Sequence, residues 1–178
     1  MKTRKHRLSE DSYIGEKIYF ITIDLYAEYF RNEELIFIVK NILDATLKKY
    51  NIINLLTTFM YNHIHFILQG MNEKSNIKKC IKTFKSLVTL NADIKSAITK
   101  DTVFANFNWR GFWHKDFYDH IVRNKKSLSK IIRYVLENPV RKGYVKNYIA
   151  WRYSFSDKFD LKDFANVCYD SAIDILTL

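Results

Sequence analysis

Two histidines, His63 and His65, stand two residues apart inside the apolar run YNHIHFIL of residues 61–68. Side chains alternate between the two faces of a strand, so both imidazoles would share one face and the apolar residues the other. Neutral imidazole nitrogens bind divalent ions, and two of them on one face can reach the same ion. A hydrogen-bonded or solvent-facing pair has the same spacing, so the spacing alone leaves both interpretations open.

A second pair of chemically useful side chains lies in IIRYVLENPVRKGYV, residues 131–145. Tyr134 and Asn138 are four residues apart and would share one face of a helix. The Asn138 amide oxygen could complete an ion site with the histidines, and the Tyr134 phenol could attack a phosphate held there. Equally, Tyr134 could be a core or surface residue, and Asn138 could end its helix.

Tyr118 is the rival nucleophile, because it also follows the histidines at a plausible interval. Four residues after it stands Val122, which cannot bind an ion. We therefore rank Tyr118 second.

Hydrophobic periodicity predicts the elements that must position these side chains. The expected order is a strand over 17–26, a helix from Asn32 to Lys49, strands over 52–60 and 63–69 joined by a hairpin turn at Tyr61 and Asn62, a helix over 76–98, a fourth strand within 112–122, and a helix from Ser127. This last helix should end near Asn138, because a proline disfavours helix at the residue before it. The order βαββαβ plus a helix predicts an α+β sandwich, with one antiparallel sheet and helices on one face.

Composition limits the partners. The 178 residues carry a formal net charge of +10, although residues 155–178 hold five Asp and only two Lys. We expect a flexible basic arm over 1–16, one catalytic domain over 17–155 and an acidic extension over 156–178. The basic part favours nucleic acid as partner, with an anionic membrane surface second.

No apolar run is long enough to span a membrane, and the N-terminus lacks the apolar centre of a signal peptide. A soluble, cytoplasmic protein is therefore expected, as monomer or homodimer. Cys80 and Cys168 stand far apart, without a second metal-binding residue at ligand spacing. Both are expected to be buried or idle thiols in a reducing cytosol.

Basic and aromatic side chains are the candidates for DNA contact. Phosphate contacts are expected from the arm, from one face of the second helix and from the end of the last helix. Stacking on bases is expected from aromatic residues near the start of the fourth-strand region. The candidates are Arg4, Lys5, Arg7, Lys78, Lys82, Lys85, Arg141 and Lys142 for phosphates, and Trp109, Phe112 and Trp113 for bases. A solvated charged face and a set of core aromatics have the same pattern.

Taken together, these motifs resemble a known family. His-apolar-His after Asn62, followed by Tyr-x-x-x-Asn-Pro-Val-Arg-x-Gly at residues 134–143, is similar to the one-tyrosine HUH transposases, and within them to the REP-associated tyrosine transposases. Further matching pieces are Met60, Phe112-Trp113, Asp119-His120, Arg123-Asn124, Trp151 and Tyr153-Ser154. The similarity covers residues 17 to 155. One departure is Tyr61, where such proteins usually have proline.

The resemblance implies a ferredoxin-like fold and a metal-dependent nuclease and strand transferase that acts on single-stranded or hairpin DNA. His63, His65 and Asn138 would bind Mg²⁺ or Mn²⁺. Tyr134 would form a 5′-phosphotyrosine link and free a 3′-hydroxyl. A domesticated descendant that no longer mobilises DNA would keep the same residues.

Two other functions compete with this one. A non-catalytic single-strand or RNA-binding module can have the same βαββαβ order, and RGFWHKDF of residues 110–117 partly matches an RRM signature. A metal-dependent phosphoesterase that uses water would need the same ion but no tyrosine. Metal dependence separates cleavage from binding, and a covalent adduct separates tyrosine from water as the nucleophile.

Overall fold

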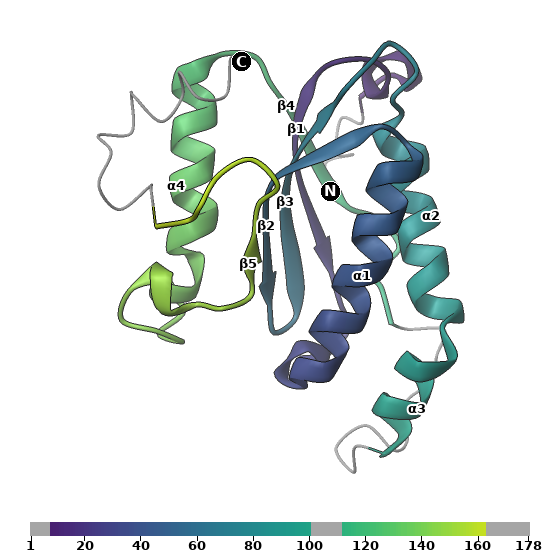
Figure 1. Cartoon of the computed structure of the whole chain (residues 1–178), viewed down its shortest axis with the longest axis vertical. Helices are drawn as coiled ribbons and strands as arrows, with labels where there is room; N and C mark the ends of the chain where they lie inside the picture. Colours follow the sequence, from purple (N-terminus) through teal and green to yellow (C-terminus); the bar gives the residue numbers. More distant parts are fainter. Residues whose placement is uncertain (1–7, 101–111, 163–178) are drawn as a thin grey trace, which may run out of the picture.

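A five-stranded antiparallel sheet with strand order β4-β1-β3-β2-β5 forms the middle layer of the protein (Figure 1). The computed structural model describes residues 8–100 and 112–162. The strands are β1 (Ile18–Asp24), β2 (Ile52–Met60), β3 (His63–Gly70), β4 (Tyr118–Val122) and β5 (Ser154–Phe155). The first four have the order of a ferredoxin-like sheet, which confirms the predicted fold class.

Helices cover both faces of this sheet. On one face lie α1 (Glu33–Lys49), α2 (Ile77–Leu90) and α3 (Ala92–Lys100); α4 (Lys125–Arg141) lies on the other (Figure 1). The larger core cluster forms on the α1 and α2 side, and a smaller one forms under α4. The prediction of helices on one face thus holds for the βαββαβ unit, and the additional helix closes the second face.

Burial on both faces explains why the central hairpin reads as nearly continuous apolar sequence. Every β2 residue except Ile53 is buried, and β3 is buried from Ile64 to Leu68. On β1 only one face is fully buried, so its sequence alternates: Tyr19 and Ile21 are buried and Asp24 is exposed. This alternation places Thr22 and Asp24 on the α4 side, with the histidines.

Several predicted boundaries change. The predicted helix over 76–98 is two helices, because Asn91 ends α2 in an extended conformation and its side chain then accepts a hydrogen bond from Ile94 N. The fourth strand pairs only over Tyr118–Val122. Its following helix begins at Lys125, because the Asn124 side chain caps it by accepting from Ser127 N at 2.8 Å.

The helix α4 does not end at Asn138 as predicted, but continues through Pro139 to Arg141. Gly143, with φ 71°, ends the helix. Gly143 N donates to Val140 O at 2.9 Å, and Tyr144 N donates to Pro139 O at 2.9 Å, the two hydrogen bonds of a Schellman motif. The glycine, rather than Asn138, therefore serves as the helix stop.

The segment after α4 returns to the sheet and pairs with its edge. Thr57 and Thr58 of β2 pair with Phe155 and Ser154, and the Trp151 indole donates to Phe59 O at 3.0 Å. A two-residue strand gives no periodic signal, so sequence patterns could not predict β5.

Part of the predicted arm over 1–16 is packed against the domain. Tyr13 is buried, and its hydroxyl donates to Asp119 Oδ2 at 3.0 Å. Arg4, Lys5 and Arg7 lie outside the described residues. No helix in the described ranges is long and apolar enough to cross a membrane.

Candidate active site

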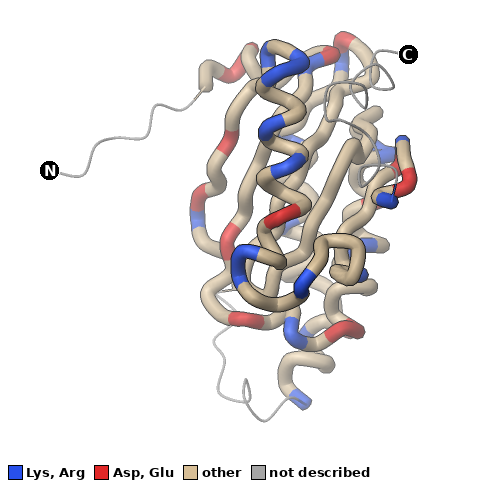
Figure 2. The backbone as a smooth tube through the Cα atoms, turned by 90° about the vertical axis from the view of Figure 1, so that its left-hand side faces the viewer, with Lys and Arg blue, Asp and Glu red and all other residues tan. Residues whose placement is uncertain are grey.

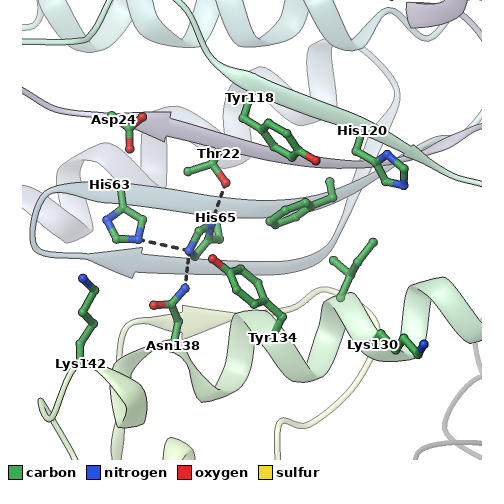
Figure 3. A pocket seen from close by; sticks show the side chains of 12 residues that line it. Thr22, Asp24, His63, His65, Tyr118, His120, Lys130, Tyr134, Asn138 and Lys142 are labelled. Atoms are coloured by element: carbon green, nitrogen blue, oxygen red, sulfur yellow. Dashed lines mark hydrogen bonds between the residues drawn. The ribbon is translucent and has the colours of Figure 1, made fainter. Parts of the chain in front are cut away.

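A cavity of about 730 Å³ opens between α4 and the face of β1, β3 and β4 that this helix covers. It brings together the predicted His63, His65, Tyr118, Tyr134, Asn138 and Lys142 (Figure 3). The other lining residues are Phe20, Thr22, Asp24, His120, Lys130 and Ile131. Residues that are 73 positions apart in the sequence therefore meet, as the proposed ion site requires.

The two histidines are close neighbours on β3. His63 Nε2 and His65 Nε2 lie 3.2 Å apart. His63 Nδ1 lies 2.7 Å from Asn62 Oδ1, and His65 Nδ1 lies 2.8 Å from Thr22 Oγ1. Both Nδ1 atoms thus face a polar partner, and both Nε2 atoms face the cavity.

Asn138 lies on the opposite wall, on α4, and is 5% exposed. Its Nδ2 lies 2.6 Å from His65 Nε2. Because amide oxygen and nitrogen exchange places on a half-turn of the side chain, the same position can present Oδ1 to the histidines. Asn138 is buried and turned inward, so the structure places it beside the histidines as the sequence predicted.

Burial keeps the imidazoles neutral, as ion binding requires. Burial lowers the pKa of His63; the charge of Asp24 opposes this effect and that of Lys142 adds to it. Burial, with the charges of His63 and Arg141, lowers the pKa of His65 to about 3. A nitrogen lone pair on each of the two imidazole rings is therefore available to bind an ion near neutral pH.

The donor set can hold a small divalent ion. Metal–nitrogen bonds of about 2.1 Å that meet at about 90° separate two nitrogens by about 3 Å, close to the observed 3.2 Å. No group of three or more His, Cys, Asp or Glu side chains converges in the described part of the chain. The third donor of this set is an amide, so any ion here would rest on two imidazoles and Asn138.

Tyr134 projects into the cavity one helical turn before Asn138. Its ring centre lies 5.5 Å from that of His65, and Figure 3 shows its hydroxyl directed toward His65 and Asn138. The side chain is 44% exposed, so a substrate can reach it. Arg141 holds this tyrosine: its Cζ lies 4.4 Å from the ring centre, and its guanidinium donates to Tyr134 O at 2.8 Å.

Tyr118 lines the same cavity but is directed elsewhere. Figure 3 shows its hydroxyl turned toward His120, away from the two histidines of β3. Tyr134 is thus the better placed of the two candidate nucleophiles.

The predicted DNA contacts on α2 do not reach this cavity. Lys78, Lys82 and Lys85 line a smaller cavity of about 350 Å³ beside Tyr13. Lys78 pairs with Glu10, and Lys85 Nζ donates to His114 O at 2.7 Å. These lysines lie on the α1 and α2 side of the sheet, opposite the histidines.

The expectation that Phe112 and Trp113 stack on bases is corrected. Phe112 is 1% exposed and Trp113 is 8% exposed, and the Trp113 indole donates to Lys85 O at 3.1 Å. Both are core residues, so Phe112, one of the two aromatics of the RRM-like match, is not available for stacking. Trp109 lies outside the described residues.

Sequence reasoning missed the β1 contribution and the basic face of α4. Thr22 and Asp24 pair in register with His65 and His63 respectively, a relation that only strand pairing reveals. α4 carries five basic residues and one acidic residue, and the view onto it shows basic positions along the helix (Figure 2). Lys125, Lys126, Lys130 and Arg133 were visible in the sequence, but it did not show that their helix lies over the histidines or that Lys130 lines the same cavity.

Comparison with known proteins gives a consistent result. A Haemophilus influenzae protein with the provisional name REP-associated tyrosine transposase is 28% identical over 93 residues, which is 52% of each chain. The chain is similar to the REP-associated tyrosine transposases, as its motifs predict. It spans about half the length of that curated relative. No family model matches.

A solved REP-associated tyrosine transposase, bound to a REP hairpin, superposes with a TM-score of 0.69 at 18% identity. The match covers 94% of this chain and 90% of the transposase. At this identity, the superposition establishes the shared fold.

Proposed function

We propose that this protein is a metal-dependent nuclease and strand transferase of single-stranded DNA, with Tyr134 as nucleophile. The observation that carries the proposal is the meeting of His63 Nε2, His65 Nε2 and the Asn138 amide in one cavity, with the Tyr134 hydroxyl directed at them. The similarity to REP-associated transposases supports the choice of DNA, and the hairpin bound to the solved relative suggests a hairpin substrate.

In this mechanism the Tyr134 oxygen attacks the scissile phosphorus. The phosphorus–O3′ bond breaks as the tyrosine–phosphorus bond forms, which leaves a 5′-phosphotyrosine and a 3′-hydroxyl. The phenol loses its proton, and the departing O3′ takes one up. A later attack by a 3′-hydroxyl reverses these bond changes, so strand transfer needs no nucleotide cofactor.

The residues of the cavity divide this work. His63, His65 and Asn138 would hold Mg²⁺ or Mn²⁺, which would polarise a non-bridging phosphate oxygen and offset the developing charge. Arg141 fixes the Tyr134 ring through its stacked guanidinium, so the phenol need not be ordered when substrate binds. Lys142, exposed at the cavity edge, is placed to meet a neighbouring phosphate.

The test is a denaturing gel of the full chain with labelled hairpin and single-stranded DNA from the flanks of its own gene, with Mn²⁺ or with EDTA. We expect a slow covalent band that requires both the metal and Tyr134. Tyr134→Phe should abolish the band and leave DNA binding intact, whereas Tyr118→Phe should retain it.

Each competing function gives a different gel. Loss of the band in Tyr118→Phe but not in Tyr134→Phe would reassign the nucleophile. Metal-dependent cleavage without any adduct would indicate water as the nucleophile. Tight binding without cleavage under any metal would favour the non-catalytic binding module.

A further inference from the structure

The proposed chemistry uses only one half of the cavity. The other half is lined by the apolar side chains Phe20, Tyr118 and Ile131, with His120 and Lys130 beside them. An apolar wall with a few polar groups is typical of a site for a flat organic ligand. Each nucleotide of DNA carries one such flat organic group, its base, next to a phosphate.

Tyr118 presents an aromatic surface to this half. It is 47% exposed, so a ligand in the cavity can reach its ring. Its ring centre lies 5.8 Å from that of Phe20, at an interplanar angle of 65°. Phe20 thus contacts Tyr118 by an edge-to-face arrangement, which leaves part of the Tyr118 ring open to the cavity.

Phe20 also joins the two halves of the cavity. Its ring centre lies 5.7 Å from that of His65 and 6.0 Å from that of Tyr134. A group that rests on Phe20 therefore touches both the nucleophile side and the Tyr118 side.

Strand register sets the distance between the halves. Tyr118 of β4, Thr22 of β1 and His65 of β3 are direct partners across three neighbouring strands. Two strand spacings of about 4.8 Å place Tyr118 about 10 Å from His65 along the sheet. A phosphate held at the histidines can therefore place the base of the adjoining nucleotide against Tyr118.

We propose that this half of the cavity is a nucleobase pocket, in which Tyr118 stacks on the base next to the scissile phosphate. The proposal rests on the proposed function, because that function defines which phosphate is the scissile one. The stacking itself needs no cleavage. Stacking accepts any base, because every base has a π-face. His120 and Lys130 lie where they can hydrogen-bond the edge of that base and so discriminate among the four.

Tyr118→Phe and Tyr118→Ala separate stacking from every use of the hydroxyl. Phenylalanine keeps the ring and removes the oxygen, whereas alanine removes both. Tyr118→Leu fills a similar space without a π-face and serves as a second variant if the alanine variant folds poorly. Tyr26→Ala is the matched control, because Tyr26 is 56% exposed, stacks on His114 and lies outside the cavity.

The experiment measures fluorescence anisotropy of labelled single-stranded DNA, with an abasic site moved through successive positions. Binding is measured in the Tyr134→Phe background, so that no strand is cleaved. We expect Tyr118→Ala to weaken binding of intact DNA roughly 5- to 100-fold, with Tyr118→Phe within about 2-fold of the parent. At one position, an abasic site should weaken DNA binding by the parent as much as Tyr118→Ala weakens binding of intact DNA. The same abasic site should not weaken binding by Tyr118→Ala any further.

Three results would overturn the proposal: equal losses for Tyr118→Phe and Tyr118→Ala, an equal loss for Tyr26→Ala, or additive effects of Tyr118→Ala and the abasic site at every position. Failure of the proposed function is a separate outcome, since it appears as a missing Tyr134 adduct on the denaturing gel. If the effects of Tyr118→Ala and the abasic site on binding are non-additive but no adduct forms, the base-pocket proposal stands and the nuclease proposal fails.

Discussion

Both ring nitrogens of His65 are engaged, and this double contact fixes the direction of the ring. Thr22 Oγ1 lies 2.8 Å from Nδ1, while His63 and Asn138 approach Nε2. For Nε2 to accept an ion, Nδ1 must carry the proton and donate it to Thr22. The threonine hydroxyl can accept that proton, so its position is compatible with the tautomer that the proposed ion site needs.

Replacing Thr22 by valine should weaken the site without reshaping it. Valine keeps the β-branch but cannot accept from Nδ1, and loss of such a partner typically costs about 10- to 100-fold in metal affinity or activity. We expect a higher Mn²⁺ concentration for half-maximal adduct formation, measured by titration of the gel assay.

Thr22→Ser is the matched control, because serine retains the hydroxyl. It should titrate within a few-fold of the parent. If valine and serine shift the titration equally, the shape of the side chain, rather than its hydrogen bond, controls the site.

Sequence patterns predicted the site residues that follow a strand or helix spacing. They missed the site residues that strand pairing brings into the cavity. The alternation of β3 places His63 and His65 on one face, and helical spacing places Tyr134 beside Asn138. Thr22, Asp24 and Phe20 contribute through the register of β1 with its neighbours, which one sequence does not specify. The sequence also could not tell that Trp113 is a core residue, because buried and stacking aromatics share the same composition.

Among the elements, α4 contributes most to the site, since it carries both Tyr134, the proposed nucleophile, and the Asn138 amide. Asn138 can point inward because the chain continues helically past it and stops at Gly143. Pro139 lies in this last turn and is buried, so its packing can offset the backbone hydrogen bond that it cannot donate. The rule about residues before proline failed here because tertiary packing outweighed a local preference.

Gly143→Ala should loosen the end of α4. A Cβ at this position would meet nothing within 4 Å, so the cost comes only from the left-handed backbone with φ 71°. We expect a loss of about 1 kcal/mol in the free energy of unfolding, measured by urea denaturation. Gly143→Asn should lose less, because asparagine tolerates this conformation; an unchanged stability in both variants would mean that the helix end rearranges freely.

On the opposite face, α2 is fixed by its buried side, which includes Cys80. Cys80 is 0% exposed, and burial raises the pKa of its thiol to about 12. Because the thiolate is the reactive form, Cys80 in the folded protein should not react with a thiol reagent at pH 8.

The measurement uses a Cys168→Ser variant, so that Cys80 is its one remaining thiol. The reagent should modify less than a tenth of the protein in its native form and all of it in urea. Rapid modification of the native form would show that α2 separates from the sheet.

Over the whole molecule, two helices on opposite faces of the sheet each contribute a net charge of +4 to the total of +10. α2 has four lysines and no acidic residue, and α4 has five basic residues and one acidic residue. The sequence favoured α2 because its lysines recur at helical spacing. The structure places the histidines under α4, so under the proposed function α4 is the better candidate for the helix that follows the DNA backbone.

Salt dependence can compare the two helices directly. Lys126 and Lys130 of α4 and Lys79 and Lys82 of α2 are all exposed, so the double variants Lys126→Gln/Lys130→Gln and Lys79→Gln/Lys82→Gln remove equal charge from each face. Each phosphate contact to a single strand contributes about 0.7 to the slope of log affinity against log salt. The α4 variant should lower the magnitude of that slope by about 1.4 and weaken binding, while the α2 variant changes the slope little. The reverse result would place the DNA on the α2 face, away from the histidines, and would then count against Tyr134 as well.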